Sequence, residues 1–168
     1  SQVRIDTQSL LRLARVAAEI ALERGDPSAA WVEARVVLHP DHRSYPPYDL
    51  PLLVLAARSL AALNLAGLTA SDAAGETITS DAAEAALRRV LARASSWPTA
   101  RAYLALFEAE LGGTHHDGFD VVLWRSAVDA ARAPTVPVQV MPEALLRLAG
   151  ALVAQGDRIA AQASAEAA

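Results

Sequence analysis

Two alanine-rich helical stretches of this chain are each interrupted by a Gly-Asp pair and resume at once. One interruption is Gly25-Asp26, in LERGDPSAAWVEA (residues 22–34), and the other is Gly156-Asp157, in LVAQGDRIAAQASAEA (residues 152–167). Glycine ends a helix where a left-handed residue is required, and aspartate caps the helix that follows. A two-residue joint therefore predicts a tight pair of antiparallel helices, a helical hairpin, near each end of the chain.

The composition predicts an all-α fold. Apolar residues make up 53% of the 168 residues, and much of that share is alanine, whereas aromatic residues make up only 5%. Alanine has the highest helix propensity and loses no side-chain entropy on burial. The length is sufficient for one domain with a hydrophobic core.

Apolar residues at helical spacing, separated by Gly- and Pro-containing loops, predict eight helices. We expect them over residues 7–24, 27–38, 50–66, 81–94, 98–111, 119–132, 142–155 and from 157 onward. The proline-rich stretch 39–51 is expected to be non-helical. Ser80 and Asp117 are expected to cap the fourth and sixth helices.

The same spacing predicts which side of a helix faces the core. The expected buried residues are Leu10, Leu13, Ala17 and Ile20 in the first helix, Leu53, Ala56, Leu60 and Leu63 in the third, and Ala100, Leu104, Phe107 and Leu111 in the fifth.

The hairpins recur at a nearly constant interval. Gly25, Gly67, Gly112 and Gly156 mark the expected middles of four hairpins, at spacings of 42, 45 and 44 residues. The pattern resembles a loosened tetratricopeptide repeat (TPR), whose unit has about 34 residues. Small residues stand at the positions where that repeat requires them, namely Ala18, Ala30, Ala149 and Ala161. The resemblance implies antiparallel helical hairpins stacked as an irregular, TPR-like right-handed solenoid, one domain over residues 1–168.

The motif departs from that repeat at its aromatic positions. These positions hold Ala14 and Ala21 in the first hairpin, and Leu145 and Leu152 in the last. Small residues alone still let two helix backbones approach closely, as a stacked solenoid requires.

Residues 96–168 have a more specific order of motifs. Ala109-Glu110 ends one helix, Trp124-Arg125-Ser126-Ala127 lies in the next, ALLRLAGAL (residues 144–152) forms a third, and Gly156-Asp157-Arg158 precedes an alanine-rich end. This order resembles the helical region of the large ATP-binding LuxR-type (MalT-like) transcription regulators of actinobacteria. The longer connector APTVPVQVMP (residues 133–142) departs from the short turn that is common in that family.

The resemblance implies a segment of a longer, cytoplasmic chain, with an ATPase core upstream and a helix-turn-helix DNA-binding domain downstream. It implies a non-catalytic role as a scaffold for protein interaction and signal relay, with no cofactor. The implied partners are another protein, other domains of the same chain, or a small-molecule inducer.

Charge and residue usage exclude several function classes for the segment itself. All 15 basic residues are arginine, and without lysine the chain contains no phosphate-binding P-loop. The net charge of −4 provides no basic field for direct nucleic-acid binding. No uncharged apolar run reaches the ~18 residues of a membrane span. The sequence lacks cysteine and shows no signal peptide, which fits a cytoplasmic location.

Two histidine clusters in expected loops are the candidate metal ligands. His39, Asp41 and His42 form the first cluster, and His115, His116 and Asp117 form the second. Imidazole and carboxylate groups suit zinc, iron or nickel, and three ligands with one open position would make a catalytic site. Polar residues in loops beside proline and glycine are also expected simply to be solvated. A metal-dependent enzyme that uses these histidines is therefore one alternative function.

Buried polar and aromatic residues provide the remaining candidates. Glu110 is expected to pair with an arginine of a neighbouring helix, with Arg125 as the first choice. The three tryptophans are expected to fill space between hairpins, each with its indole N–H bonded to a carbonyl. Tyr45 and Tyr48, in SYPPYD, form either a partner contact or a packed loop. A free-standing helical binding or oligomerisation module, and thus a homo-oligomer, is the second alternative; its contacts would be this loop and the last helix.

Overall fold

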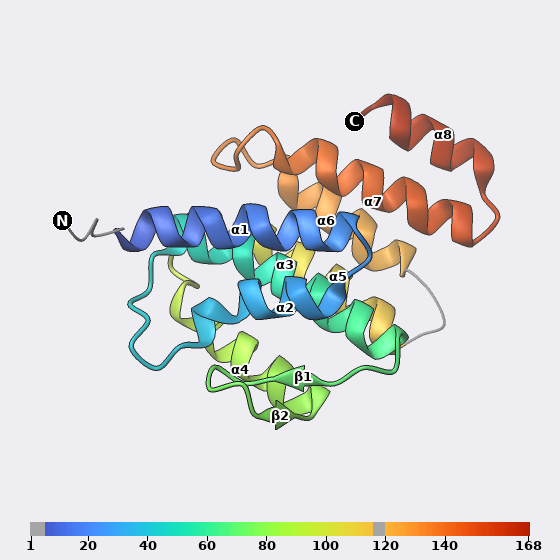
Figure 1. The fold of residues 1–168 in the computed structure, drawn as a ribbon. Coiled ribbons are helices and arrows are strands. Elements are labelled where there is room, and N and C mark those ends of the chain that lie inside the picture. Colours follow the sequence, from blue (N-terminus) through green and yellow to red (C-terminus); the bar gives the residue numbers. More distant parts are fainter. Residues whose placement is uncertain (1–5, 116–119) are drawn as a thin grey trace. The chain divides into compact units, whose positions relative to one another are not determined.

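The computed structural model describes residues 6–115 and 120–168, without the side chains of residues 113–115. The chain is mostly helical: 71% is helix, 3% is strand, and the described part has eight α-helices (Figure 1). The all-α prediction is therefore confirmed. The chain divides into two compact units, residues 1–95 and 96–168.

Unit 1 contains four α-helices, three of which surround the fourth. They are α1 (Thr7–Glu23), α2 (Pro27–Ala34), α3 (Pro46–Leu65) and α4 (Ser80–Arg93), and the 3-10 helix η1 (Arg35–Leu38) follows α2 directly. The central helix α3 packs against α1, α2 and α4. All four residues predicted on its buried face, Leu53, Ala56, Leu60 and Leu63, are buried. α3 is long and apolar enough to cross a membrane, but 67% of its apolar 18-residue window is buried inside the structure, as in the core helix of a folded domain.

α3 begins at Pro46, so the prediction that residues 39–51 are non-helical is wrong for its last part. Proline is tolerated in the first turn of a helix because the N–H groups there have no intrahelical acceptor. Pro46 and Pro47 occupy those first positions, and only Pro51 lies in the helix interior.

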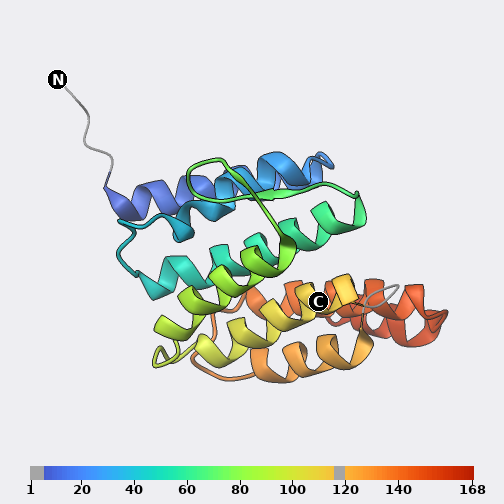
Figure 2. The same ribbon diagram turned by 90° about the horizontal axis from the view of Figure 1, so that it is seen from below.

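The structure contains a short β-hairpin between α3 and α4 that the sequence analysis did not predict. β1 (Ala70–Ser71) pairs antiparallel with β2 (Thr77–Ile78), and Gly75, with a φ of 93°, lies in the turn between them. The hairpin lies beside α2 (Figures 1 and 2), where the indole Nε1 of Trp31 donates to the carbonyl oxygen of Ser71 at 2.7 Å. Strands of two residues carry no detectable alternating pattern.

Unit 2 contains α5 (Ala100–His115), α6 (Val121–Ala131), α7 (Val140–Ala154) and α8 (Arg158–Glu166). Each helix packs against the next one along the chain. Gly112, predicted to mark a hairpin turn, lies inside α5 and is buried. A Cβ atom there would collide with Leu123 of α6, so this glycine permits close packing of two helices rather than a turn.

The Gly-Asp joints have left-handed glycines followed by capping aspartates. Gly25 has a φ of 72° and Gly156 a φ of 85°, and Asp26 and Asp157 accept backbone N–H groups of α2 and α8. Two of the predicted caps differ from the structure. Thr79, not Ser80, caps α4, and Asp120 caps α6, whereas Asp117 lies outside the described residues.

The predicted buried face of α1 is wrong. Its buried residues are Leu11, Ala14, Ala18 and Ala21, whereas Leu10, Leu13 and Ile20 are exposed. Apolar residues cover more than half of the helix circumference, so spacing alone did not identify the packed side. The alanine side faces inward because small residues let α2 and α3 approach closely.

Replacing Gly25 by alanine should destabilise unit 1 by about 1 kcal/mol, because an L-residue with a Cβ atom is strained at positive φ. Gly25→Asn should cost less, since asparagine tolerates the left-handed region. Urea unfolding of the three proteins measures the difference. Equal stability of wild type and Gly25→Ala would contradict the left-handed joint.

Candidate functional site

The structure separates His42 from the other two members of the first histidine cluster. His39 and Asp41 are exposed, and the Nδ1 atom of His39 accepts the backbone N–H of Asp41 at 3.2 Å. His42 instead turns inward and contacts Asp49. In the second cluster, His116 and Asp117 and the side chain of His115 lie outside the described residues. Within the described residues, no group of three or more His, Cys, Asp or Glu side chains is arranged to hold a metal ion.

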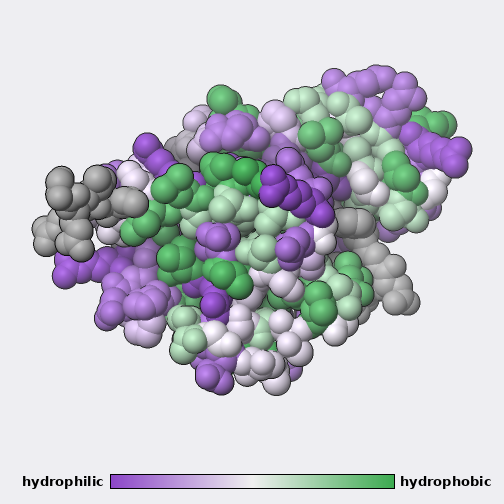
Figure 3. All heavy atoms as spheres, viewed as in Figure 1, coloured by the Kyte–Doolittle hydropathy of each residue, from purple (hydrophilic) through white to green (hydrophobic). Residues whose placement is uncertain are grey.

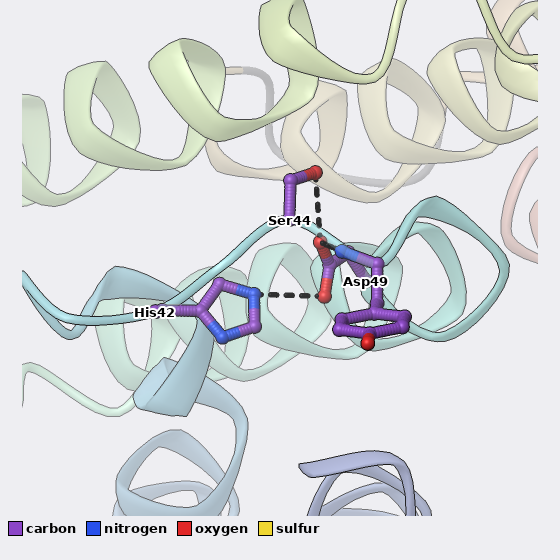
Figure 4. Close-up of polar contacts among 4 residues, drawn as sticks. His42, Ser44 and Asp49 are labelled. Carbon is purple, nitrogen blue, oxygen red and sulfur yellow. Dashed lines mark hydrogen bonds and ion pairs between the residues drawn. The ribbon is translucent and has the colours of Figure 1, made fainter.

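A buried carboxylate organises the loop before α3 (Figure 4). Asp49 lies in the first turn of α3 and is fully buried. Its Oδ1 atom is 2.9 Å from the Nε2 atom of His42, and its Oδ2 atom accepts the Ser44 hydroxyl at 3.1 Å and the Tyr45 backbone N–H at 2.7 Å. The positive end of the helix dipole favours a carboxylate at this position. The loop is thus fastened to α3 through one side chain.

The geometry of this cluster does not suit nucleophilic catalysis. An activated serine donates its proton to histidine, and histidine is then oriented by the carboxylate. Here Ser44 and His42 both contact Asp49, so His42 is not the acceptor for the Ser44 hydroxyl. The side chain of His42 is only 7% exposed, which restricts access by a substrate. We interpret the cluster as a structural contact that holds the loop against α3.

The two candidate tyrosines have different surroundings. The hydroxyl of Tyr48 accepts from Arg12 of α1 at 2.9 Å and donates to Gln8 at 3.3 Å. The guanidinium of Arg12 also lies 5.1 Å from the centroid of the Tyr48 ring. Tyr48 therefore packs the first turn of α3 onto α1, whereas Tyr45, in the loop before α3, is exposed.

Three helices of unit 2 meet at a largely buried ion pair, and its arginine differs from the expected one. Glu110 of α5 is buried and accepts from Arg147 of α7, not from Arg125. Two nitrogens of Arg147 contact the two carboxylate oxygens, with Nε at 3.2 Å from Oε1. The same guanidinium lies 5.5 Å from the ring centroid of Trp124 in α6. The contact is a bidentate pair stacked on an aromatic ring.

The tryptophans only partly follow the expectation that they fill space between hairpins. Trp31 and Trp124 are fully buried, but Trp97 is exposed. The indole N–H of Trp31 reaches a carbonyl, whereas the Nε1 atom of Trp124 is buried without a hydrogen-bond partner in the described part of the chain.

A surface groove lies between α5 and α6. It encloses about 630 Å³ and is lined by Arg101, Leu104, Ala105, Glu108, Val122, Leu123, Arg125, Ser126, Asp129 and Ala130. Leu104, predicted to be buried, is 42% exposed here, and Val122 is 72% exposed. Two arginines and two carboxylates accompany these apolar residues, so the lining of the groove is partly apolar and carries no net charge.

The spacing of the groove residues shows why the sequence did not reveal it. Residues 101, 104, 105 and 108 lie on one side of α5, and residues 122, 125, 126 and 129 lie on one side of α6. Each set mixes apolar and charged residues, which is also the pattern of an ordinary solvent-facing helix. Only the pairing of the two helices brings Leu104 and Val122 into one surface.

Comparison with models of protein families, with curated proteins and with solved structures finds no significant match for this chain. The class that the fold itself defines is an all-α protein made of two compact helical units.

Proposed function

We propose that this chain is a non-catalytic, TPR-like helical module that binds a protein partner through the groove between α5 and α6. The carrying observation is the exposure of Leu104 and Val122 in that groove, beside charged residues of both signs. Protein interfaces combine an apolar centre with a polar rim in this way.

The shape of the groove favours a protein segment over a small inducer. Six of its ten lining residues are exposed, so a small molecule would remain largely solvated there. Small-molecule sites bury ~70–90% of their ligand, whereas helix–groove recognition needs only a shallow apolar strip.

The described polar clusters support a non-catalytic role. His42 and Asp49 fasten a loop, and Glu110 and Arg147 connect helices of unit 2. Each of these groups has a structural partner, and the exposed groove does not contain them.

A narrower proposal follows from the resemblance of residues 96–168 to LuxR-type ATP-binding regulators. In that setting the module relays a signal between an ATPase and a DNA-binding domain, and the groove binds one of those domains or a separate protein. Consecutive helix packing in both units supports this comparison with hairpin arrays.

Site-specific photo-crosslinking in cells tests the groove. A photo-reactive residue at position 104 is expected to capture one defined protein or domain. The same residue at Ile159 of α8, an exposed apolar position outside the groove, is the matched control. Capture at both positions alike, or at neither, would overturn the proposal.

Val122→Asp should reduce crosslinking from position 104 by at least ~10-fold. A charge beside the apolar residues of the groove should weaken the binding free energy of the partner by about 1.4 kcal/mol or more. Val122 is 72% exposed, so the free energy of unfolding should change by less than about 0.5 kcal/mol. Crosslink yield and urea unfolding measure the two effects. An undiminished yield would exclude Val122 from the binding surface.

A further inference from the structure

The outward side of α1 is apolar although its opposite side already packs in the core. Leu10, Leu13, Val16 and Ile20 are between 42% and 60% exposed. Their spacings of three, three and four residues place them along one side of the helix. We call these four residues the outer stripe. Figure 3 views this face, with apolar side chains gathered over α1.

The charges beside the outer stripe have a definite order. Arg12 lies in the N-terminal half of α1, Arg15 lies at its midpoint, and Glu19 and Glu23 lie in the C-terminal half. At 100° per residue all four lie on the same flank of the stripe. The flank is therefore positive at one end and negative at the other.

Such an order is complementary to itself when two copies of α1 run antiparallel. A two-fold axis near residue 15 places Arg12 of one copy opposite Glu19 of the other, and Leu10 toward Ile20. A parallel two-fold arrangement would instead place the two charged flanks on opposite sides of the interface, where they cannot pair with each other. Isologous contacts of this kind are the commonest basis of homodimers.

The charged side chains of α1 can still form hydrogen bonds with a partner. Arg15 already pairs with Glu19 of its own helix at 2.9 Å, and Arg12 donates to Tyr48. The Arg15 and Glu19 side chains are 36% and 41% exposed. A guanidinium has five N–H donors and a carboxylate about four acceptor sites, so one contact does not exhaust either group.

We propose that a second copy of this chain docks on the outer stripe, with the two α1 helices antiparallel across a two-fold axis. A helix of 17 residues is about 25 Å long, and one helix pair buries less than the ~800 Å² per partner of a standard interface. The dimer is therefore weak, with a Kd in the micromolar range or above. The proposal is independent of the groove in unit 2.

Sedimentation equilibrium of the full chain over a wide concentration range tests this dimer. Wild type should show a monomer–dimer equilibrium, and Leu13→Glu should raise the Kd at least tenfold. Val153→Glu is the matched control, because Val153 is an exposed apolar residue of α7 with 57% exposure. A chain that stays monomeric throughout, or a Leu13→Glu variant that dimerises like wild type, would overturn the proposal.

A charge-swap pair tests the antiparallel register. Arg12→Glu and Glu19→Arg should each dimerise more weakly than wild type, because each places like charges across the axis. Mixed in equal amounts, the two variants should associate more tightly than either alone, since opposite charges then meet at both ends. Circular dichroism verifies that both variants fold. A mixture that associates no better than its components would reject the two-fold arrangement.

Discussion

Asp49→Ala is expected to lower the free energy of unfolding of unit 1 by about 3 kcal/mol. The substitution removes the acceptor of three hydrogen bonds at a fully buried position, from His42, Ser44 and the Tyr45 backbone. The donors left behind lose their partners, and a buried unsatisfied donor costs ~1–3 kcal/mol. Hydrogen exchange of the α3 amides measures the loss within unit 1.

Two control variants separate the causes of this loss. Ser44→Ala removes one hydrogen bond of an exposed residue and should cost less than about 1 kcal/mol. Asp49→Asn keeps the shape and one acceptor oxygen, so its stability should lie between those of Asp49→Ala and wild type. If Asp49→Ala is as stable as Ser44→Ala, Asp49 does not fasten the loop.

Glu110→Ala is expected to destabilise unit 2 by about 3 kcal/mol. Removing one partner of a buried ion pair leaves the other charge partly desolvated, which costs ~3–5 kcal/mol for a fully buried pair. The side chain of Arg147 is 28% exposed, so water offsets part of that cost. Urea unfolding, with the buried Trp124 as the fluorescent reporter, measures the change.

A matched surface pair and a double variant provide the controls. Glu84→Ala disrupts a partly exposed i,i+4 pair with Arg88 and should cost less than about 1 kcal/mol. Glu110→Leu combined with Arg147→Met should recover much of the stability, because apolar residues of similar size often replace a buried pair without loss. Equal effects of Glu110→Ala and Glu84→Ala would show that burial of the pair contributes nothing.

Local signals in the sequence were sufficient for much of the fold. Alanine-rich composition predicted the all-α class, and the Gly-Asp pairs fell where the structure has left-handed glycines and capping aspartates. These features depend on residues within one or two helical turns, so a single sequence contains them.

Features that depend on packing between elements were not predictable. Both sides of α1 are apolar, and only the close approach of α2 and α3 selects the alanine side. Gly112 lies where α5 and α6 pack closely together, and not in a turn. The sequence offers several arginines as partners for Glu110, and the way α7 packs in unit 2 selects Arg147.

Part of the candidate surface left no distinct signal in the sequence. Leu104 was predicted to be buried because it shares its helical spacing with Ala100, Phe107 and Leu111, which are buried. The role of Asp49 was not predicted because it depends on α3 starting at Pro46. The prolines of this stretch had instead favoured a non-helical segment.

The coding sequence on both sides of this segment tests most directly the claim that it relays a signal within a larger regulator. We predict a P-loop with its phosphate-binding lysine upstream and a helix-turn-helix motif downstream, in one open reading frame. A start codon directly before residue 1 and a stop codon directly after residue 168 would contradict the relay. The chain would then act as a free-standing helical binding module.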